Sequence, residues 1–310
     1  MERQRLIAIA GPTASGKTAL AIELCRRIGG EVVSCDSMMV YRGMDIGTAK
    51  PTLQERDGIP HHMIDVAEPG ENYSAALYRD AARRVIADIA ARGHQPVMCG
   101  GTGLYIDAVT REMSFAAAPA DADVRARLES ELAGRGAQAM HDELERVDPE
   151  SAAHLHVNDT RRVLRALEIY ELTGVPKSKS AAREGEGVEL YDLRLLALNM
   201  PRERLYARID RRVDEMCAQG LFEEVSGLLE HGLDSGCTAM QALGYKEVAQ
   251  ALRGEVARDE AISFLKQRTR NYAKRQLSWL RRDARVRWLD VREEDDVCSL
   301  ADRAMELLGI

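Results

Sequence analysis

The sequence predicts an α/β fold in which helices flank a parallel sheet and a helical insertion interrupts the chain. Short apolar runs alternate with segments of helical periodicity as far as about Phe115. The pattern is then helical, and a later apolar run indicates a return to the sheet. We therefore place a core domain at residues 1–116 and 189–310, and a helical insertion domain at residues 117–188.

The core elements follow from the alternation of apolar runs and helical periodicity. Strands that alternate with helices predict parallel pairing with right-handed crossovers. Ser74 is positioned to cap a long helix, and Gly93 to end it. The expected strands are Leu6–Ala10, Glu31–Cys35 and Gln95–Cys99, and the expected helices are Lys17–Ile28 and Ala75–Arg92.

Two linkers of small or polar residues, 114–124 and 177–190, bound the insertion. Between them, we expect helices at Val124–Ala133 and Asp159–Leu172, the second ending near Gly174. Tyr191–Met200 is apolar enough for a buried strand, so it returns the chain to the sheet. The remainder is expected to be helical up to a last short strand near Arg287–Val291.

Composition excludes several classes of protein. Of 310 residues, 45% are hydrophobic, 30% charged and 5% aromatic, which is typical of a globular, helix-rich chain rather than a disordered or fibrous one. No apolar run reaches the roughly 18 residues of a membrane span, and the first one ends in a glycine loop instead of a cleavage site. We expect a cytoplasmic monomer without a membrane partner. The six scattered cysteines lack zinc-site spacing and are expected to be reduced.

The segment GPTASGKT is the clearest functional motif. It fits the pattern G-x-x-x-x-G-K-[ST] and stands between a strand and a helix. The backbone N–H groups of such a loop bind phosphate oxygens, Lys17 adds a charge and the Thr18 hydroxyl holds Mg²⁺. The motif predicts a P-loop NTPase-like core, but leaves open whether the ligand is a nucleoside triphosphate or another diphosphate. The predicted phosphate-binding residues are Gly11, Pro12, Thr13, Ala14, Ser15, Gly16, Lys17 and Thr18.

The carboxyl edge of a parallel sheet is where ligands bind, and three loops meet there. They are the P-loop, Asp36-Ser37 after the second strand, and Gly100–Gly103 after the third. Asp36 is the carboxylate placed to face the ligand, as a residue that orients Mg²⁺, as a general base or as a strand-ending cap. The GGTGLY segment is either a tight turn or a loop that brings the Thr102 hydroxyl to the ligand.

Other charged groups admit a structural and a functional interpretation. His61 and His62 are adjacent, so their side chains point apart in an extended segment, which favours a structural role over a metal site. Arg162 and Arg165 share a helical face and contact RNA, or Arg165 pairs with Glu168. Residues 266–288 hold nine Lys and Arg against one acid in a chain of net charge −7. This segment is either a solvated face or a contact surface for a phosphate backbone.

Seven segments appear in order over nearly the whole chain: GPTASGKT at Gly11, DSMMVYRGMDIGTAKP at Asp36, HHMID at His61, GGTGLY at Gly100, NDTRRVLRALE at Asn158, QALGYKE at Gln241 and TRNYAKRQLSW at Thr269. Together they resemble the bacterial tRNA dimethylallyltransferases, also called tRNA isopentenyltransferases. A general P-loop kinase shares only the first segment. Two departures are Met39, where many members have Gln or Leu, and the lack of the zinc finger of eukaryotic relatives.

The resemblance implies that the bound diphosphate belongs to dimethylallyl diphosphate and that no nucleoside triphosphate is spent. The dimethylallyl group passes to the exocyclic N6 amine of the adenosine 3′-adjacent to the anticodon, tRNA position 37, in tRNAs that read codons beginning with U. Asp36 is then the general base, and Thr102 bonds the entering adenosine. Lys17, Mg²⁺ on Thr18, and Arg212 hold the diphosphate.

The resemblance also implies a flipped adenine in a channel that the prenyl diphosphate enters from the other end. The insertion domain closes over the anticodon stem-loop, and the basic C-terminal segment contacts the RNA backbone. Two alternatives stay open: a small-molecule or nucleotide kinase that turns over ATP, and a P-loop RNA-binding regulator whose tRNA binding is indifferent to Asp36. The implied tRNA-binding residues are Asp36, Ser37, Met38, Met39, Thr102, Arg161, Arg162, Val163, Leu164, Arg165, Gln241, Ala242, Leu243, Gly244, Tyr245 and Lys246.

Overall fold

The chain folds into two compact units. The computed structural model describes residues 3–113, 121–181, 187–234 and 236–310. The larger unit combines Met1–Thr110 with Leu190–Ile310, and the smaller one is Arg111–Glu189. The predicted domain boundary between residues 116 and 117 lies outside the described residues. Among the described residues, no helix combines the length and the hydropathy needed to cross a bilayer.

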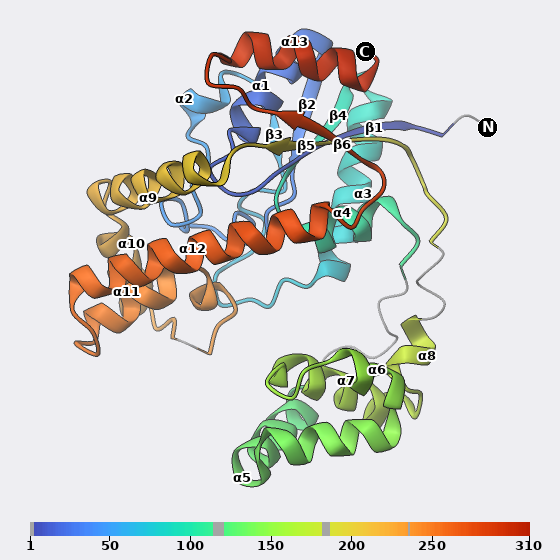
Figure 1. The fold of residues 1–310 in the computed structure, drawn as a ribbon, viewed down its shortest axis with the longest axis vertical. Helices are drawn as coiled ribbons and strands as arrows, with labels where there is room; N and C mark the ends of the chain where they lie inside the picture. Colours follow the sequence, from blue (N-terminus) through green and yellow to red (C-terminus); the bar gives the residue numbers. More distant parts are fainter. Residues whose placement is uncertain (1–2, 114–120, 182–186, 235) are drawn as a thin grey trace. The chain divides into compact units, whose positions relative to one another are not determined.

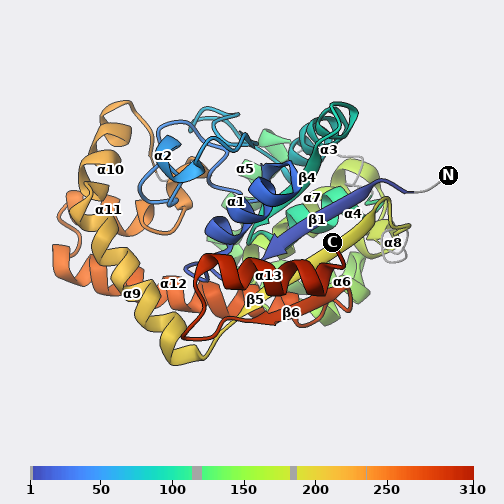
Figure 2. The ribbon, with the colours of Figure 1, turned by 90° about the horizontal axis from the view of Figure 1, so that it is seen from above.

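A parallel sheet forms the centre of the larger unit. Within the described residues it has six strands in the order β3-β2-β4-β1-β5-β6, and every neighbouring pair is parallel. Figure 2 shows β1, β5 and β6 running side by side. This arrangement confirms the predicted fold class. The strands are β1 (Arg5–Ala10), β2 (Gly30–Ser34), β3 (His61–His62), β4 (Gln95–Gly100), β5 (Asp192–Asn199) and β6 (Val286–Asp290).

Helices cover both faces of the sheet, as expected for strands that are apolar on both sides. Apolar side chains of α1 and α13 pack on one face, and those of α3 and α4 pack on the other. Helices α9, α10 and α11 gather with part of α12 at one end of the unit (Figure 1). The helices of this unit are α1 (Lys17–Ile28), α2 (Leu53–Arg56), α3 (Ala75–Ala91), α4 (Gly103–Thr110), α9 (Arg202–Ala218), α10 (Leu221–Glu230), η1 (Ala239–Gln241), α11 (Tyr245–Leu252), α12 (Arg258–Leu280) and α13 (Val297–Leu308).

The smaller unit is helical, with a core that includes Leu128, Met140, Leu144 and Leu167. Its first helix is longer than the predicted Val124–Ala133, because the chain kinks at Gly136, where φ is 81°, and then continues as a helix. The helices are α5 (Ala122–Val147), α6 (Pro149–His154), α7 (Thr160–Thr173) and α8 (Lys177–Ala181).

A buried carboxylate ties the edge of the sheet together and accounts for His62. Glu31 on β2 accepts hydrogen bonds from Nη1 and Nη2 of Arg92 and lies 2.7 Å from His62 Nε2. His61 Nδ1 lies 2.8 Å from the Ile59 carbonyl oxygen. In the part of the chain that the structure describes, no three His, Cys, Asp or Glu residues are arranged to hold a metal. The contact with Glu31 supports a structural role for His62, whereas Nε2 of His61 is buried without a hydrogen-bond partner among the described residues.

Replacing Glu31 with Gln is expected to weaken the fold at neutral pH and to matter less in acid. The Arg92 hydrogen bond, opposed by burial and aided by His62, lowers the pKa of Glu31 from 4.5 to about 2. Because the folded-state pKa is depressed, its stabilisation is present above pH 4.5 and is lost as the pH falls towards 2. Arg92 is partly exposed, so we expect Glu31→Gln to cost about 2 kcal/mol at neutral pH. Urea unfolding of both proteins checks this. An equal difference at pH 7 and pH 3 would contradict it.

Candidate active site

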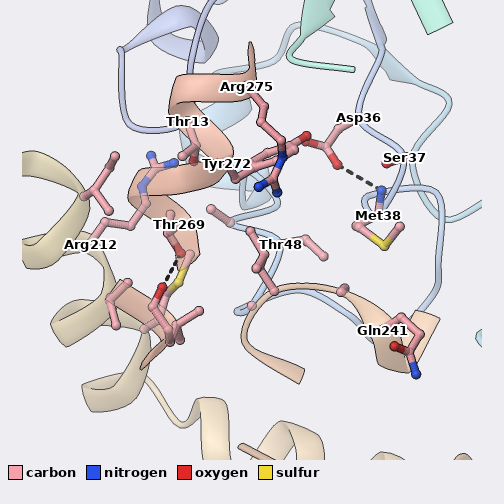
Figure 3. A pocket seen from close by; sticks show the side chains of 18 residues that line it. Thr13, Asp36, Ser37, Met38, Thr48, Arg212, Gln241, Thr269, Tyr272 and Arg275 are labelled. Atoms are coloured by element: carbon pink, nitrogen blue, oxygen red, sulfur yellow. Dashed lines mark hydrogen bonds between the residues drawn. The ribbon is translucent and has the colours of Figure 1, made fainter. Parts of the chain in front are cut away.

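A cavity of about 310 Å³ opens at the carboxyl edge of the sheet in the larger unit (Figure 3). It joins the P-loop and the segment after β2 to α9, α12 and the segment after η1, so residues far apart in sequence share one space. Its lining residues are Thr13, Asp36, Ser37, Met38, Gly47, Thr48, Ala49, Ile209, Arg212, Val213, Met216, Gln241, Ala242, Leu243, Leu265, Thr269, Tyr272 and Arg275.

The P-loop reaches this cavity through Thr13, and of the other predicted diphosphate-binding residues Arg212 lines it. Gly16, with φ of 97°, adopts the left-handed conformation immediately before α1, which a glycine does without steric cost. The Thr13 N–H donates a hydrogen bond of 2.9 Å to the Gln276 side chain. Ser15 Oγ is buried and has no hydrogen-bond partner among the described residues. A buried hydroxyl without a partner is unusual in a folded protein, and in this loop it points to a ligand.

Two cations lie close to each other beside this loop. Burial lowers the pKa of Lys17, and the Arg212 guanidinium lowers it further, whereas Asp36 acts in the opposite direction. Burial also lowers the pKa of Arg212. Within the described ranges, no carboxylate lies at ion-pair distance from either residue. A partly desolvated pair of positive charges without a counter-ion favours an anionic ligand between them.

Asp36 presents a free acceptor to the cavity. Its Oδ1 accepts a 2.9 Å hydrogen bond from the Met38 N–H, and its Oδ2 accepts none from the residues that the structure describes. Oγ1 of Thr102 accepts a 3.1 Å hydrogen bond from the N–H of the next residue, Ser37. The carboxylate is thus held by one oxygen, and the other is available to a proton donor in the cavity.

Helix α12 contributes side chains that the motif analysis did not single out. Figure 3 shows Tyr272 beside Asp36, with Arg275 at the same wall. Burial raises the pKa of Tyr272, Asp36 raises it further, and a hydrogen bond with Thr102 opposes them. Tyr272 is therefore a neutral phenol next to both groups. In the sequence, Thr269, Tyr272 and Gln276 recur at the spacing of one helical face. That spacing was the signal from which their shared orientation could have been predicted.

Two glycines let α12 approach the loop after β4. Gln276 donates a 3.0 Å hydrogen bond to the Gly101 carbonyl, and a Cβ atom at Gly101 would overlap its amide group. A Cβ atom at Gly103 would overlap the Trp279 indole. These close contacts, rather than unusual backbone angles, explain Gly101 and Gly103 of the GGTG segment.

Gly103→Ala is therefore expected to destabilise the protein by about 1–3 kcal/mol, because the rigid indole of Trp279 and α12 must move. A matched control is Gly134→Ala on α5, where an added Cβ meets no atom within 4 Å and the substitution should be neutral or stabilising. Thermal unfolding of both variants checks the contrast. Equal melting temperatures for the two variants would show that α12 does not pack as described.

The other residues expected to bind tRNA fall into two groups, those that line the cavity and those that do not. In the larger unit, Gln241, Ala242 and Leu243 line the cavity, as do Ser37 and Met38. Five expected residues of this unit do not line it: Thr102, half-buried Met39, Gly244 at the start of α11, Tyr245 in the core, and Lys246 beside another cavity.

In the smaller unit, the five residues 161–165 lie on α7. Val163 and Leu164 are buried in the core, whereas Arg161 and Arg162 are exposed. Arg165 Nη1 lies 3.0 Å from Glu168 Oε2, so Arg165 forms the ion pair with Glu168 that was one of its two predicted roles.

Glu224 on α10 organises a loop at the cavity wall and was not predicted. Its carboxylate accepts hydrogen bonds from the backbone N–H groups of Asp45, Ile46 and Gly47, at 2.8–3.1 Å. The Tyr245 hydroxyl donates a 2.6 Å hydrogen bond to the same carboxylate. The buried Tyr245 thus fixes the loop that carries Gly47, Thr48 and Ala49 into the cavity, although its own side chain is not part of the lining.

Comparison with known proteins gives consistent matches. The sequence model of a family described as IPP transferase matches residues 39–283. A curated tRNA dimethylallyltransferase of Halalkalibacterium halodurans is 47% identical over 293 residues, which are 94% of this chain and 93% of the relative. Another, of Geobacter metallireducens, is 48% identical over 289 residues, 93% of each chain.

Solved structures agree with these matches. The full-length tRNA isopentenylpyrophosphate transferase of Bacillus halodurans has a TM-score of 0.72 and 44% identity, covering 99% of this chain and 97% of that chain. A eukaryotic dimethylallyltransferase acting on tRNA has a TM-score of 0.81 and 32% identity, covering 97% of this chain and 78% of that chain. The fold of the larger unit is therefore the P-loop NTPase-like fold that its first motif predicts.

Proposed function

This chain belongs to the IPP transferase family of tRNA dimethylallyltransferases, and from that premise we propose how its cavity carries out prenyl transfer. Dimethylallyl diphosphate binds the P-loop, and the adenosine at position 37 of tRNAs that read codons beginning with U enters beside Asp36. The observation that carries the proposal is that one cavity joins a phosphate-binding loop to a carboxylate with an unused oxygen.

In the proposed reaction, Asp36 accepts a proton from the adenine amine, and the P-loop side of the cavity holds the leaving diphosphate. The N6 lone pair of adenine forms a bond to C1 of the dimethylallyl group, while the bond between C1 and the diphosphate oxygen breaks. Because an exocyclic adenine amine is a weak nucleophile, it must lose a proton as the new bond forms. Oδ2 of Asp36 accepts that proton, and the bonding electrons of the C1–O bond leave with the diphosphate.

The P-loop wall stabilises the leaving diphosphate. Lys17, Arg212 and the backbone N–H groups of Gly16, Lys17 and Thr18 face the oxygens on which negative charge accumulates, whereas the Thr13 N–H stays bonded to Gln276. The Ser15 hydroxyl, which lacks a partner among the described residues, donates to one of those oxygens. The existing desolvation of both cations strengthens this interaction at the moment of bond breaking.

A magnesium ion fits this donor set. Mg²⁺ sites commonly use one or two protein oxygens together with substrate phosphates, and the Thr18 hydroxyl supplies such an oxygen at the start of α1. The absence of a three-ligand His, Cys, Asp or Glu cluster from the described residues agrees with a substrate-dependent site. When bound, Mg²⁺ neutralises charge on the diphosphate.

The tRNA contacts are proposed from the remaining walls of the cavity. An adenine in an anticodon loop must leave the base stack to reach Asp36, so the cavity receives a flipped base. Ser37, Met38 and Gln241 line the space around it, and Thr102 orients the base through its hydroxyl. The exposed Arg161 and Arg162 of the helical insertion contact the anticodon stem-loop.

The proposal is tested by donor choice. The protein is incubated with Mg²⁺, an unmodified tRNA with adenosine at position 37, and either dimethylallyl diphosphate or ATP, and nucleoside masses are read after digestion. We expect a prenyl mass increase on adenosine with the first donor alone, and none in a matched tRNA with guanosine at that position. Formation of ADP without a mass increase would favour the kinase alternative.

A further inference from the structure

We propose that Arg208 on α9 is a positioning residue of the diphosphate site, which holds the P-loop in the conformation that binds a diphosphate. Arg208 does not line the active-site cavity, so it acts through the loop and not on the substrate. Its Nε donates a 2.8 Å hydrogen bond to the carbonyl oxygen of Ala14, 194 residues away in the sequence. That this diphosphate belongs to dimethylallyl diphosphate rests on the proposed function.

Ala14 is a point of the P-loop at which the backbone is strained. Its φ is 63°, in the left-handed region that an L-residue other than glycine adopts at a cost. Asparagine and aspartate can offset this cost by bonding locally to the backbone, but an alanine side chain has no polar atom that does so. Such a conformation persists where surrounding contacts impose it, and the hydrogen bond from Arg208 is such a contact.

The guanidinium group of Arg208 also reaches the end of the loop. Its Nη2 lies 3.6 Å from the position that a Cβ atom at Gly16 would take. Gly16 is the first of the residues whose N–H groups face the diphosphate in the proposed reaction, and α1 begins directly after it. One side chain therefore lies against the loop both at its strained residue and at the start of the phosphate-binding segment.

The charge around Arg208 favours an anionic ligand nearby over a structural ion pair. Among the described residues, no carboxylate lies at ion-pair distance from Arg208, and its two terminal nitrogens have no hydrogen-bond partner. Burial lowers its pKa, and the neighbouring Arg204, Arg211 and Arg212 lower it further. A half-buried cation among cations is unfavourable in the free protein, and a bound diphosphate offsets that repulsion.

The P-loop is held from two sides, and only one of the two contacts is specific to it. Gln276 on α12 accepts the Thr13 N–H, but it also donates to the Gly101 carbonyl, so its replacement would disturb two loops. Arg208 makes a single hydrogen bond within the described residues, and this bond ends on the P-loop. Loss of the Arg208 side chain therefore releases the P-loop alone.

The proposal is tested by the affinity for inorganic pyrophosphate in the presence of Mg²⁺, measured by calorimetry. Arg208→Gln is compared with Arg204→Gln, which removes the same charge one turn earlier on α9. Arg204 is also half-buried and donates a 3.1 Å hydrogen bond to a backbone carbonyl, but that carbonyl belongs to Val291, outside the P-loop.

We expect Arg208→Gln to bind pyrophosphate roughly tenfold more weakly than the parent, because a relaxed Ala14 leaves only a fraction of the protein in the binding conformation. Arg204→Gln should bind as the parent does. Equal affinities of the two variants would overturn the proposal.

A second background separates the positioning of the loop from the charge of the arginine. Glycine adopts the φ of Ala14 without steric cost, so in Ala14→Gly the loop depends less on the hydrogen bond from Arg208. Adding Arg208→Gln to Ala14→Gly should therefore weaken pyrophosphate binding by about threefold or less. The same tenfold loss in both backgrounds would mean that the arginine acts through its charge alone, and the positioning role would be wrong.

Thermal unfolding of the free proteins distinguishes a positioning residue from a structural one. The melting temperature of Arg208→Gln should stay at the parent value, since the repulsion that is relieved offsets the hydrogen bond that is lost. A lower melting temperature combined with unchanged pyrophosphate affinity would show that Arg208 only supports the fold, which would contradict the proposal.

Transfer kinetics relate this result to the proposed function. Arg208→Gln should raise KM for dimethylallyl diphosphate and leave KM for tRNA at the parent value, whereas a rise in KM for tRNA alone would overturn the proposal. If Arg208→Gln weakens pyrophosphate binding but the parent forms no prenylated adenosine, the proposed function fails and the role of Arg208 stands. If the parent forms prenylated adenosine and Arg208→Gln matches Arg204→Gln, the role of Arg208 fails and the proposed function stands.

Discussion

Asp36→Asn is expected to bind tRNA and dimethylallyl diphosphate as the parent does, and to transfer the dimethylallyl group roughly 10²–10⁴ times more slowly. The asparagine side-chain oxygen still accepts the Met38 N–H, so the loop after β2 keeps its geometry. The amide does not accept a proton from the adenine amine, so the loss falls on the transfer step. Single-turnover rates with both substrates saturating measure it directly.

A matched control is Asp214→Asn, which removes an exposed carboxylate from α9 outside the cavity. It should leave the transfer rate unchanged. If Asp36→Asn transferred at nearly the parent rate, Asp36 would not be the base. If it lost tRNA binding instead, the carboxylate would act in tRNA recognition and not as the base, and the regulator alternative, in which tRNA binding is indifferent to Asp36, would be contradicted as well.

Lys17→Met is expected to lower kcat/KM for dimethylallyl diphosphate by roughly 10²–10³-fold, the range for removal of one donor to a developing anion. Methionine keeps the unbranched stem and the helix propensity at the start of α1, so the P-loop itself should persist. The Arg212 guanidinium remains beside the ligand but then carries the interaction alone. Initial rates over a range of donor concentrations separate kcat from KM.

The exposed Arg211→Gln, next to Arg212 on the same helix, is the control for loss of one positive charge, and it should stay at the parent value. A Lys17→Met variant within about threefold of the parent would mean that the diphosphate lies elsewhere in the cavity. The thermal stability of each variant is measured in parallel, so a folding defect is not mistaken for lost catalysis.

Features set by local sequence were predictable. Helix α1 has the predicted bounds, Lys17–Ile28, because a glycine turn precedes it and Gly29 ends it. Ser74 caps α3 by accepting a 3.2 Å hydrogen bond from the Leu77 N–H, as its position predicts. The two-residue strand β3 was not predicted, because two residues carry no periodicity and the strand depends on pairing with Val32 and Val33.

Features set by long-range packing were not predictable from motifs. The Thr13 N–H is held by Gln276, 263 residues away, and the loop at Gly47 by Glu224, 177 residues away. Such partners are brought together only by the tertiary fold. A run of consecutive residues on a helix cannot all face one ligand, because successive side chains point in different directions. Within residues 161–165, Val163 and Leu164 are buried and therefore do not face the solvent.

The most direct test of the central claim is a crystal structure of this protein with an anticodon stem-loop and a dimethylallyl diphosphate analogue that does not react. We expect N6 of adenosine 37 to lie about 2.6–3.2 Å from Oδ2 of Asp36, with the diphosphate on Lys17 and Arg212. An adenine that remains in the base stack, or an N6 amine that faces a group other than Asp36, would contradict it.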